Sequence, residues 1–407
     1  MPPFPTLPLT GPGLRRSVLP STNGSHDRLD VDQFRVGAAG HILLAGELAL
    51  VRGSPLQEAL MRCLRIIARR FGGPEVLEAA QEEVPEPGRG EVLVRELAAG
   101  VSFADLLMRE GIHPEKTTPP FTPGWDIVGV VEKTGEGVSQ ARVGQMVAAL
   151  PIHGGYAQYI CLPEDELTPV PAGLDPAEAV SLVLNYVTAY QMLHRLGHAS
   201  AGQRALIHGA AGGVGTALLQ LGRLIGLKMY GTASLADHQI VSDLGATPID
   251  YQKTNFVDEI HRLTGEGADL IFDGVGEANV WRSFQALRPG GRVIAYGFTS
   301  FLQKGQLASG LRYRLRGILR PAGYALRAFL SPGRRRILPY SIQYLKRWKP
   351  AWFREDLSAL LDMLRDKKIK PMVAERIPLN EARRAQELLG QGLVRGKLVL
   401  MCNSPLS

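Results

Sequence analysis

The stretch ALIHGAAGGVGTALLQLGRLIG, residues 205–226, decides the fold of this chain. An apolar run of strand type leads into a glycine-rich turn at 209–215, and a helix with apolar residues at three- and four-residue spacing follows. Ala210, Gly212 and Gly215 form a dinucleotide-binding fingerprint with alanine at its first position. Gly212 lets backbone approach a pyrophosphate, Gly215 lets the helix pack on the strand, and the helix start offers N–H donors. No Gly-Lys-Ser/Thr follows, which excludes a P-loop.

Downstream of this turn, apolar strand-like runs alternate with helical segments as far as Gly297. Five such runs and the four helices between them fit into about 95 residues, which requires parallel strands joined by crossover connections. We therefore predict the α/β class, with a doubly wound parallel sheet of the Rossmann type that binds its cofactor at the glycine turn.

The remaining sequence divides into segments that differ in composition and hydrophobic pattern. Residues 1–60 begin Pro-rich and keep no sustained period, so we predict a disordered extension there. Short β-rich runs punctuated by Gly and Pro then predict a mainly antiparallel β domain over 61–185. We expect the cofactor-binding domain over 186–325, a basic insert over 326–350, and a return of the chain to the β domain over 351–403.

Composition narrows the class of protein. The chain has 407 residues, of which 45% are hydrophobic and 21% charged, so it is neither collagen-like nor wholly disordered. Its three cysteines, Cys63, Cys161 and Cys402, form no CxxC and no Cys/His cluster, which excludes a disulfide scaffold and a structural zinc lobe. The apolar stretch 37–51 is shorter than the roughly 20 residues of a membrane span. We therefore expect a reducing, cytoplasmic location.

Three further motifs accompany the glycine turn: AGVSFAD at 99–105, PGWD at 123–126 and PIDY at 248–251. Together these motifs resemble the medium-chain dehydrogenase/reductase superfamily, and within it the zinc-free quinone oxidoreductase branch that includes the zeta-crystallin-like reductases. The resemblance covers about 61–403 and implies a GroES-like β domain followed by a Rossmann domain.

The resemblance also bears on metal chemistry. In zinc-dependent members a Cys and a His from the two β-domain motifs hold a catalytic metal, and Ser102 and Trp125 stand at those positions here. Neither is a usual zinc ligand, so no metal site is expected. A nicotinamide facing a partly apolar cleft suits hydride transfer to a quinone or an α,β-unsaturated ketone. The alternatives are an enoyl reductase acting on a thioester or lipid enone, and a membrane-associated nucleotide-binding scaffold with little turnover.

Three side chains are implied at the reacting end of the cofactor. Ser102 stands where relatives carry Asn, and it can hydrogen-bond the nicotinamide or a substrate oxygen with a shorter reach. His113 stands where relatives often carry Tyr; it can donate a proton, because the ordinary pKa of histidine is near neutrality, or it is a plain surface-loop histidine. We expect Asp105 to fix the loop geometry rather than to act as acid or base.

Cofactor contacts are implied at the glycine turn and at the strand ends. An NAD-selective site carries an acid about 20 residues after the turn. Here that strand ends in 231–234 without one, which favours NADP, while Asp237 keeps NAD possible and Ser234 can equally cap the next helix. Thr188 and Tyr251 also have plain packing roles open to them. The implied contacts are Thr188, Ala211, Gly212, Gly213, Val214, Ser234, Tyr251, Gly274, Val275 and Gly297.

Positive charge is concentrated in one segment. Residues 301–354 contain thirteen Lys or Arg and no Asp or Glu, within a chain whose net charge is +7. With Trp348 and Trp352 interleaved, the segment predicts peripheral contact with an anionic membrane, or else a solvated lid over the cleft. No nucleic-acid recognition motif accompanies the charge. Relatives are commonly homodimers through the edge of the Rossmann sheet, and we expect RVIAYG, residues 292–297, to be that edge.

Overall fold

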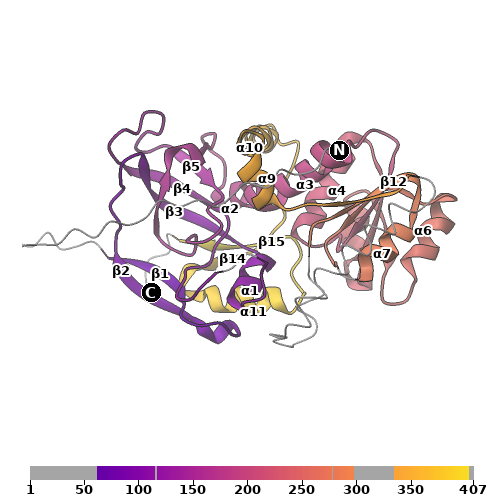
Figure 1. Ribbon diagram of the computed structural model, residues 1–407, viewed down its shortest axis with the longest axis horizontal. Coiled ribbons are helices and arrows are strands. Elements are labelled where there is room, and N and C mark those ends of the chain that lie inside the picture. Colours follow the sequence, from indigo (N-terminus) through magenta and orange to yellow (C-terminus); the bar gives the residue numbers. More distant parts are fainter. Residues whose placement is uncertain (1–61, 115–116, 277, 298–333, 403–407) are drawn as a thin grey trace, which may run out of the picture. The chain divides into compact units, whose positions relative to one another are not determined.

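The computed structural model describes residues 62–114, 117–276, 278–297 and 334–402 (Figure 1). The predicted disordered extension, and most of the basic segment, lie outside these residues. Within the part that is described, no helix is long and apolar enough to cross a membrane. Three sheets organise this part of the chain: a two-stranded sheet, a six-stranded sheet and a seven-stranded sheet.

The seven-stranded sheet is the core of the β domain, and it is completed by the end of the chain (Figure 1). Its central strand β3 is almost wholly buried and pairs antiparallel with β4, β6 and β15. Strand β15 in turn pairs with β14, so the last two strands of the sequence lie in the same sheet as β3. The strands of this sheet and of the small hairpin are β1 (Arg62–Ala68), β2 (Leu77–Glu83), β3 (Glu91–Val101), β4 (Ile127–Thr134), β5 (Met146–Ala149), β6 (Tyr159–Pro163), β7 (Thr168–Pro169), β14 (Val373–Pro378) and β15 (Lys397–Met401).

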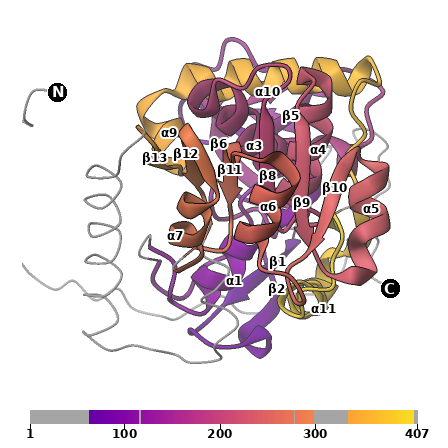
Figure 2. The same ribbon diagram turned by 90° about the vertical axis from the view of Figure 1, so that its right-hand side faces the viewer.

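The six-stranded sheet has the order β10-β9-β8-β11-β12-β13, and every neighbouring pair is parallel. Figure 2 shows these strands side by side. The order doubles back at β8, which confirms the predicted α/β class and the doubly wound sheet. The elements are β8 (Arg204–His208), α4 (Gly213–Ile225), β9 (Lys228–Ala233), α5 (His238–Asp243), β10 (Ala246–Asp250), α6 (Phe256–Thr264), β11 (Ala268–Asp273), α7 (Ala278–Gln285), β12 (Leu287–Ala295) and β13 (Arg336–Pro339).

The expectation that residues 292–297 form the edge of the parallel sheet is wrong. These residues belong largely to β12, which β13 covers on its outer side, and Tyr296 and Gly297 lie beyond the end of β12. Strand β13 is itself inside the range 326–350 that was expected to be an insert, as is helix α9 (Ile342–Trp348). The reason is that the two apolar residues of this strand, Ile337 and Leu338, directly follow three consecutive arginines, so the sequence resembled a basic insert.

Helix α10 (Pro350–Arg365) packs against the helical segment that precedes the parallel sheet. Its apolar residues recur at three- and four-residue spacing, which places one stripe in the core. On the same side, buried Asp356 accepts hydrogen bonds from Arg195 at 2.8 Å and Gln191 at 3.0 Å. The stripe is Phe353, Leu357, Leu360, Leu361 and Leu364. The other helices are α1 (Phe103–Arg109), α2 (Pro176–Ser181), α3 (Val187–Tyr190) and α11 (Ala382–Gly390), with π-helical turns at Leu182–Tyr186 and Gln191–Gly197.

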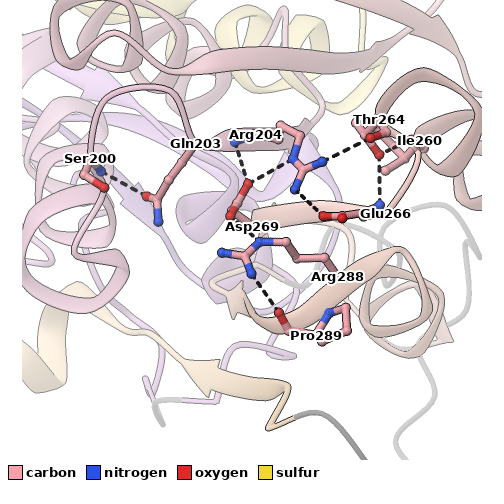
Figure 3. Close-up of polar contacts among 10 residues, drawn as sticks. Ser200, Gln203, Arg204, Ile260, Thr264, Glu266, Asp269, Arg288 and Pro289 are labelled. Atoms are coloured by element: carbon pink, nitrogen blue, oxygen red, sulfur yellow. Dashed lines mark hydrogen bonds and ion pairs between the residues drawn. The ribbon is translucent and has the colours of Figure 1, made fainter.

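Asp269 ties three strands together at the amino-terminal edge of the parallel sheet (Figure 3). Its carboxylate accepts from the backbone N–H of Arg204 on β8 at 2.8 Å and pairs with Arg288 on β12. Burial acts to raise the pKa of Asp269, but the hydrogen bonds from the two arginines hold it below its usual value. These ion pairs therefore connect β8, β11 and β12 at the amino-terminal edge of the sheet.

Phe272 tests the packing of this sheet, because it is fully buried on central strand β11. We expect Phe272→Ala to lower the free energy of unfolding by about 3–5 kcal/mol, measured by urea denaturation. Phe71→Ala is the matched control, since Phe71 is 40% exposed, and we expect it to lose less than half as much. Equal losses in the two variants would contradict this description of the core.

Candidate cofactor and active site

The glycine turn ends in a helix start that no side chain caps. Gly212 is the N-cap of α4, and its backbone is extended (φ −78°, ψ 177°) with no side-chain hydrogen bond to the helix. The first N–H groups of a helix have no acceptor within the helix, so those of Gly213 and Val214 are left as donors at the start of α4. Ala211 is nearly buried and Val214 partly exposed beside them. The residues present therefore fit a pyrophosphate, and this is where a dinucleotide would be held.

Close packing explains why glycines are required in the turn. A Cβ at Gly215 would collide with the carbonyl oxygen of Gly209, and a Cβ at Gly213 would collide with the side-chain amide of Asn185. Gly209 itself has φ +64°, which favours glycine. The turn is thus fixed by contacts on both sides, and the close packing predicted for Gly215 is confirmed.

The carboxyl ends of the parallel strands bring three more predicted residues together. Gly274 and Val275 follow β11, and Gly297 follows β12, its parallel neighbour. A Cβ at Gly297 would collide with the carbonyl oxygen of Gly274, so the two loops touch. Thr188 is buried on α3, and the hydroxyl of Tyr340, which follows β13, donates to the side-chain oxygen of Gln191 at 2.9 Å.

The end of β9, where the adenosine ribose would lie, contains an ion pair that sequence reasoning missed. The Ser234 hydroxyl donates to the Asp237 carboxylate at 2.7 Å, and the Arg395 guanidinium donates to the same carboxylate at 2.6 Å. Tyr251, 54% exposed, follows directly on Asp250, whose strand partner Ala233 precedes Ser234. Arg395 lies 158 residues beyond Asp237, so no local pattern pointed to it.

Ser102 and Asp105 form a capping box at the start of α1. The Ser102 hydroxyl donates to the Asp105 carboxylate at 2.7 Å and accepts from the Asp105 backbone N–H at 3.3 Å. The carboxylate also accepts from the Gly124 N–H at 2.8 Å and from the Tyr156 hydroxyl at 3.3 Å. Asp105 therefore joins the 99–105 motif to the 123–126 motif, and its geometry is that of a structural centre.

His113 and Trp125 lie edge to face, with ring centroids 5.4 Å apart. Trp125 is buried, and its indole N–H points at the sulfur of Met108 at 3.1 Å. His113 is half-buried, so it keeps access to solvent beside the same motif. Among the residues that the structure describes, no three His, Cys, Asp or Glu side chains are grouped so that they could hold a metal ion.

One short segment connects the glycine turn with the Ser102 loop. Gly396 donates its N–H to the Ala211 carbonyl at 3.0 Å and forms a parallel bridge with Gly212. The next residue, Lys397, is buried and donates to Asp126 at 3.1 Å. Strand β15 then runs antiparallel to β3, which ends one residue before Ser102. The segment thus links the dinucleotide turn to both β-domain motifs.

A hollow of about 590 Å³ lies at the opposite end of α4 from the glycine turn. Gln220, Arg223 and Lys370 are among the residues that line it. It includes none of the predicted site residues, so it is not the cofactor groove.

Two protein families match the sequence. The family described as alcohol dehydrogenase GroES-like domain matches residues 88–172, within the β domain. The family described as zinc-binding dehydrogenase matches residues 244–400, from the parallel sheet to β15.

Individual relatives agree with these matches. The synaptic vesicle membrane protein VAT-1 homolog of Rattus norvegicus is 37% identical over 246 residues, which make up 60% of this chain and 60% of that protein. The quinone oxidoreductase of Homo sapiens is 36% identical over 245 residues, or 59% of this chain and 74% of that protein. The crystal structure of Escherichia coli quinone oxidoreductase complexed with NADPH has a TM-score of 0.72 at 26% identity, covering 83% of this chain and 99% of that one.

Asp105 makes the pH dependence of stability measurable. Burial raises the pKa of its carboxyl to about 6, against the opposing hydrogen bonds from Ser102 and Gly124. Between about pH 4 and pH 6 the folded chain therefore holds a proton that the unfolded chain releases, and stability falls as the pH rises. As the pH rises through this window, we expect the unfolding free energy of the wild type to fall, relative to that of Asp105→Asn, by on the order of 1.4 kcal/mol per pH unit. A pH-independent difference in urea denaturation would contradict the raised pKa.

Proposed function

The chain belongs to the quinone oxidoreductase branch of the medium-chain dehydrogenase/reductase superfamily, and on that premise we propose that it is a zinc-independent, NADPH-dependent reductase acting on a quinone or an activated enone. The observation that carries the proposal is the uncapped start of α4, which offers backbone N–H donors at the carboxyl edge of a parallel sheet. When bound, NADPH supplies the hydride. The family relationship supports the oxidoreductase class, and the acceptor is our assignment.

We assign the cofactor contacts as follows. The N–H groups of Gly213 and Val214 bind the pyrophosphate, and the loops around Val275 and Gly297 orient the nicotinamide half. Reduction of a quinone takes up one hydride and one proton, and His113 is the half-buried group that we assign as proton donor. Ser102 is less suited to donate, because its hydroxyl hydrogen is already directed at Asp105.

The reaction itself tests this proposal. We expect the purified full chain to oxidise NADPH in stopped-flow experiments only when a quinone or enone is added, and elemental analysis to find no stoichiometric zinc. His113→Asn is expected to lower the rate with quinones while leaving NADPH binding unchanged. Cofactor binding without acceptor-dependent turnover would favour the scaffold alternative, and one tightly bound zinc per chain would contradict the proposed chemistry.

The preference for NADPH rests on Arg395. Its guanidinium lies at the end of β9, next to Ser234, and no acid occupies the strand end itself. A guanidinium matches the geometry of a phosphate, so we propose that Arg395 turns from Asp237 to the 2′-phosphate of the bound coenzyme.

Arg395→Ala is expected to raise the KM for NADPH about tenfold and to leave the KM for NADH unchanged, because one charge-assisted contact is lost. Arg383→Ala is the matched control, since Arg383 pairs on the surface with Glu387 of the same helix. Steady-state kinetics with both coenzymes makes the measurement. An equal change for NADPH and NADH would show that Arg395 does not read the 2′-phosphate.

Helix α9 gives the proposed membrane contact a place within the described residues. Tyr344 and Trp348 lie four residues apart on one face of this helix, and they are 64% and 77% exposed. Arg347 and Lys349 are exposed beside them. Exposed aromatic rings between cations are typical of helices that lie in the interface of an anionic membrane.

The membrane contact is testable by co-sedimentation. We expect the full chain to bind vesicles that contain phosphatidylserine more tightly than neutral vesicles, and the double variant Tyr344→Ser, Trp348→Ser to lose most of this binding. Leu235→Ser is the control, because Leu235 is 61% exposed on a different element. Unchanged binding by the double variant would rule out α9 as the contact.

A further inference from the structure

A chain of hydrogen bonds lies buried beneath the carboxyl ends of β8, β9 and β11. The His208 ring is at its centre: Nδ1 lies 3.1 Å from the Thr232 hydroxyl, and Nε2 lies 3.0 Å from the Ser283 hydroxyl. The Ser283 hydroxyl donates in turn to the Asp273 carboxylate at 2.7 Å. All four side chains are buried. They come from three strand ends and from helix α7.

The hydrogen bond between Ser283 and Asp273 determines which group donates and which accepts in the other bonds of this chain. A carboxylate only accepts, so the Ser283 hydroxyl donates to Asp273 and must accept from His208. Nε2 of His208 therefore carries the hydrogen, and Nδ1 accepts from the Thr232 hydroxyl. Burial lowers the pKa of His208, although Asp273 acts to raise it, which favours the neutral ring that this arrangement needs. The rings of His208 and Phe256 also lie nearly perpendicular to each other, with centroids 4.6 Å apart.

The two ends of the chain terminate on the two loops assigned to the cofactor. At one end, Thr232 accepts the N–H of Gly209 on its hydroxyl at 3.3 Å and the N–H of Ala210 on its carbonyl at 3.0 Å. At the other end, Asp273 accepts the N–H groups of Val275 at 2.9 Å and Gly276 at 3.0 Å. The glycine turn and the β11 loop are thus joined through one imidazole.

We propose that His208 is a positioning residue that holds the glycine turn and the β11 loop as one unit, so that the pyrophosphate and nicotinamide halves of the coenzyme meet a preformed groove. The inference rests on the proposed function, because it assigns those two loops to the coenzyme. Any buried histidine needs partners for both ring nitrogens, so what points to a role at the site is where the bonds of these partners lead. Here each is satisfied, and both ends act on backbone N–H groups of the site.

Ser283 and Asn279 provide a matched pair of variants. Both donate to the same oxygen of Asp273, Ser283 at 2.7 Å and Asn279 at 3.0 Å. Only Ser283 also touches His208. Ser283→Ala therefore cuts the connection between the loops, whereas Asn279→Ala removes one bond to Asp273 and leaves the connection intact.

Hydrogen exchange of the full chain reads the coupling directly, by mass spectrometry on peptides that cover 209–214 and 274–280. We expect Ser283→Ala to speed exchange about tenfold in both peptides, although Ser283 contacts neither Gly209 nor Ala210. We expect Asn279→Ala to speed exchange only in 274–280. Unchanged exchange of 209–214 in Ser283→Ala, or equal effects of the two variants there, would overturn the inference.

Thr232 gives a second test that does not depend on Ser283. Thr232→Val keeps the shape of the side chain and removes the hydroxyl, whereas Thr232→Ser keeps the hydroxyl. We expect the Kd for NADPH, measured by its fluorescence, to rise about tenfold in Thr232→Val and to stay near the wild-type value in Thr232→Ser. Wild-type affinity in Thr232→Val would refute the role of His208. Absence of NADPH binding by the wild type would instead refute the proposed function.

The tautomer of His208 is an independent spectroscopic readout. With ¹⁵N-labelled histidine, we expect the His208 resonance to show hydrogen on Nε2 and none on Nδ1 at neutral pH, assigned by its loss in His208→Asn. Thr232→Ser should preserve this pattern, and Ser283→Ala should change it. A doubly protonated ring, or hydrogen on Nδ1, would contradict the bond directions on which the inference depends.

Discussion

The first turn of α4 is the constraint on which the rest of the site depends. Its N–H groups lack acceptors within the helix and lack a capping side chain, and they lie where the doubly wound sheet reverses its strand order. Such donors need an anionic partner or water, and the glycines allow a bulky anion to approach them. The ion pairs of Asp269 lie at the opposite edge of the sheet, and open α/β sheets bind ligands at their carboxyl edge.

The last strand of the described chain connects the glycine turn to the β domain. The strand that begins at Lys397 lies in the β-domain sheet, and the residue before it pairs with the glycine turn. The buried contact between Lys397 and Asp126 then fixes the second β-domain motif to the same segment. Burial raises the pKa of Asp126, and the attraction of the buried Lys397 ammonium opposes that rise. The dinucleotide turn and the Ser102 loop are therefore positioned by common backbone.

Sequence reasoning identified the parts of the site that local patterns encode. The strand, turn and helix around Gly212 follow from small residues at fixed spacing, and Asp105 was expected to fix the loop geometry. It could not find Arg395 or the link from His208 to Ser283, because those contacts join residues far apart in the sequence. It placed the sheet edge wrongly, because β13 offers only Ile337 and Leu338 directly after three arginines. The neighbouring positive charges made this short strand unrecognisable in the sequence, and the structure shows it paired with β12.

The most direct measurement of the central claim is an experimental structure of the full chain with NADPH bound. We expect the pyrophosphate oxygens within hydrogen-bond distance of the Gly213 and Val214 N–H groups, and the adenosine 2′-phosphate next to Ser234 and Arg395. A coenzyme bound elsewhere, or a first turn of α4 that contacts only water when the protein is saturated with NADPH, would contradict the account.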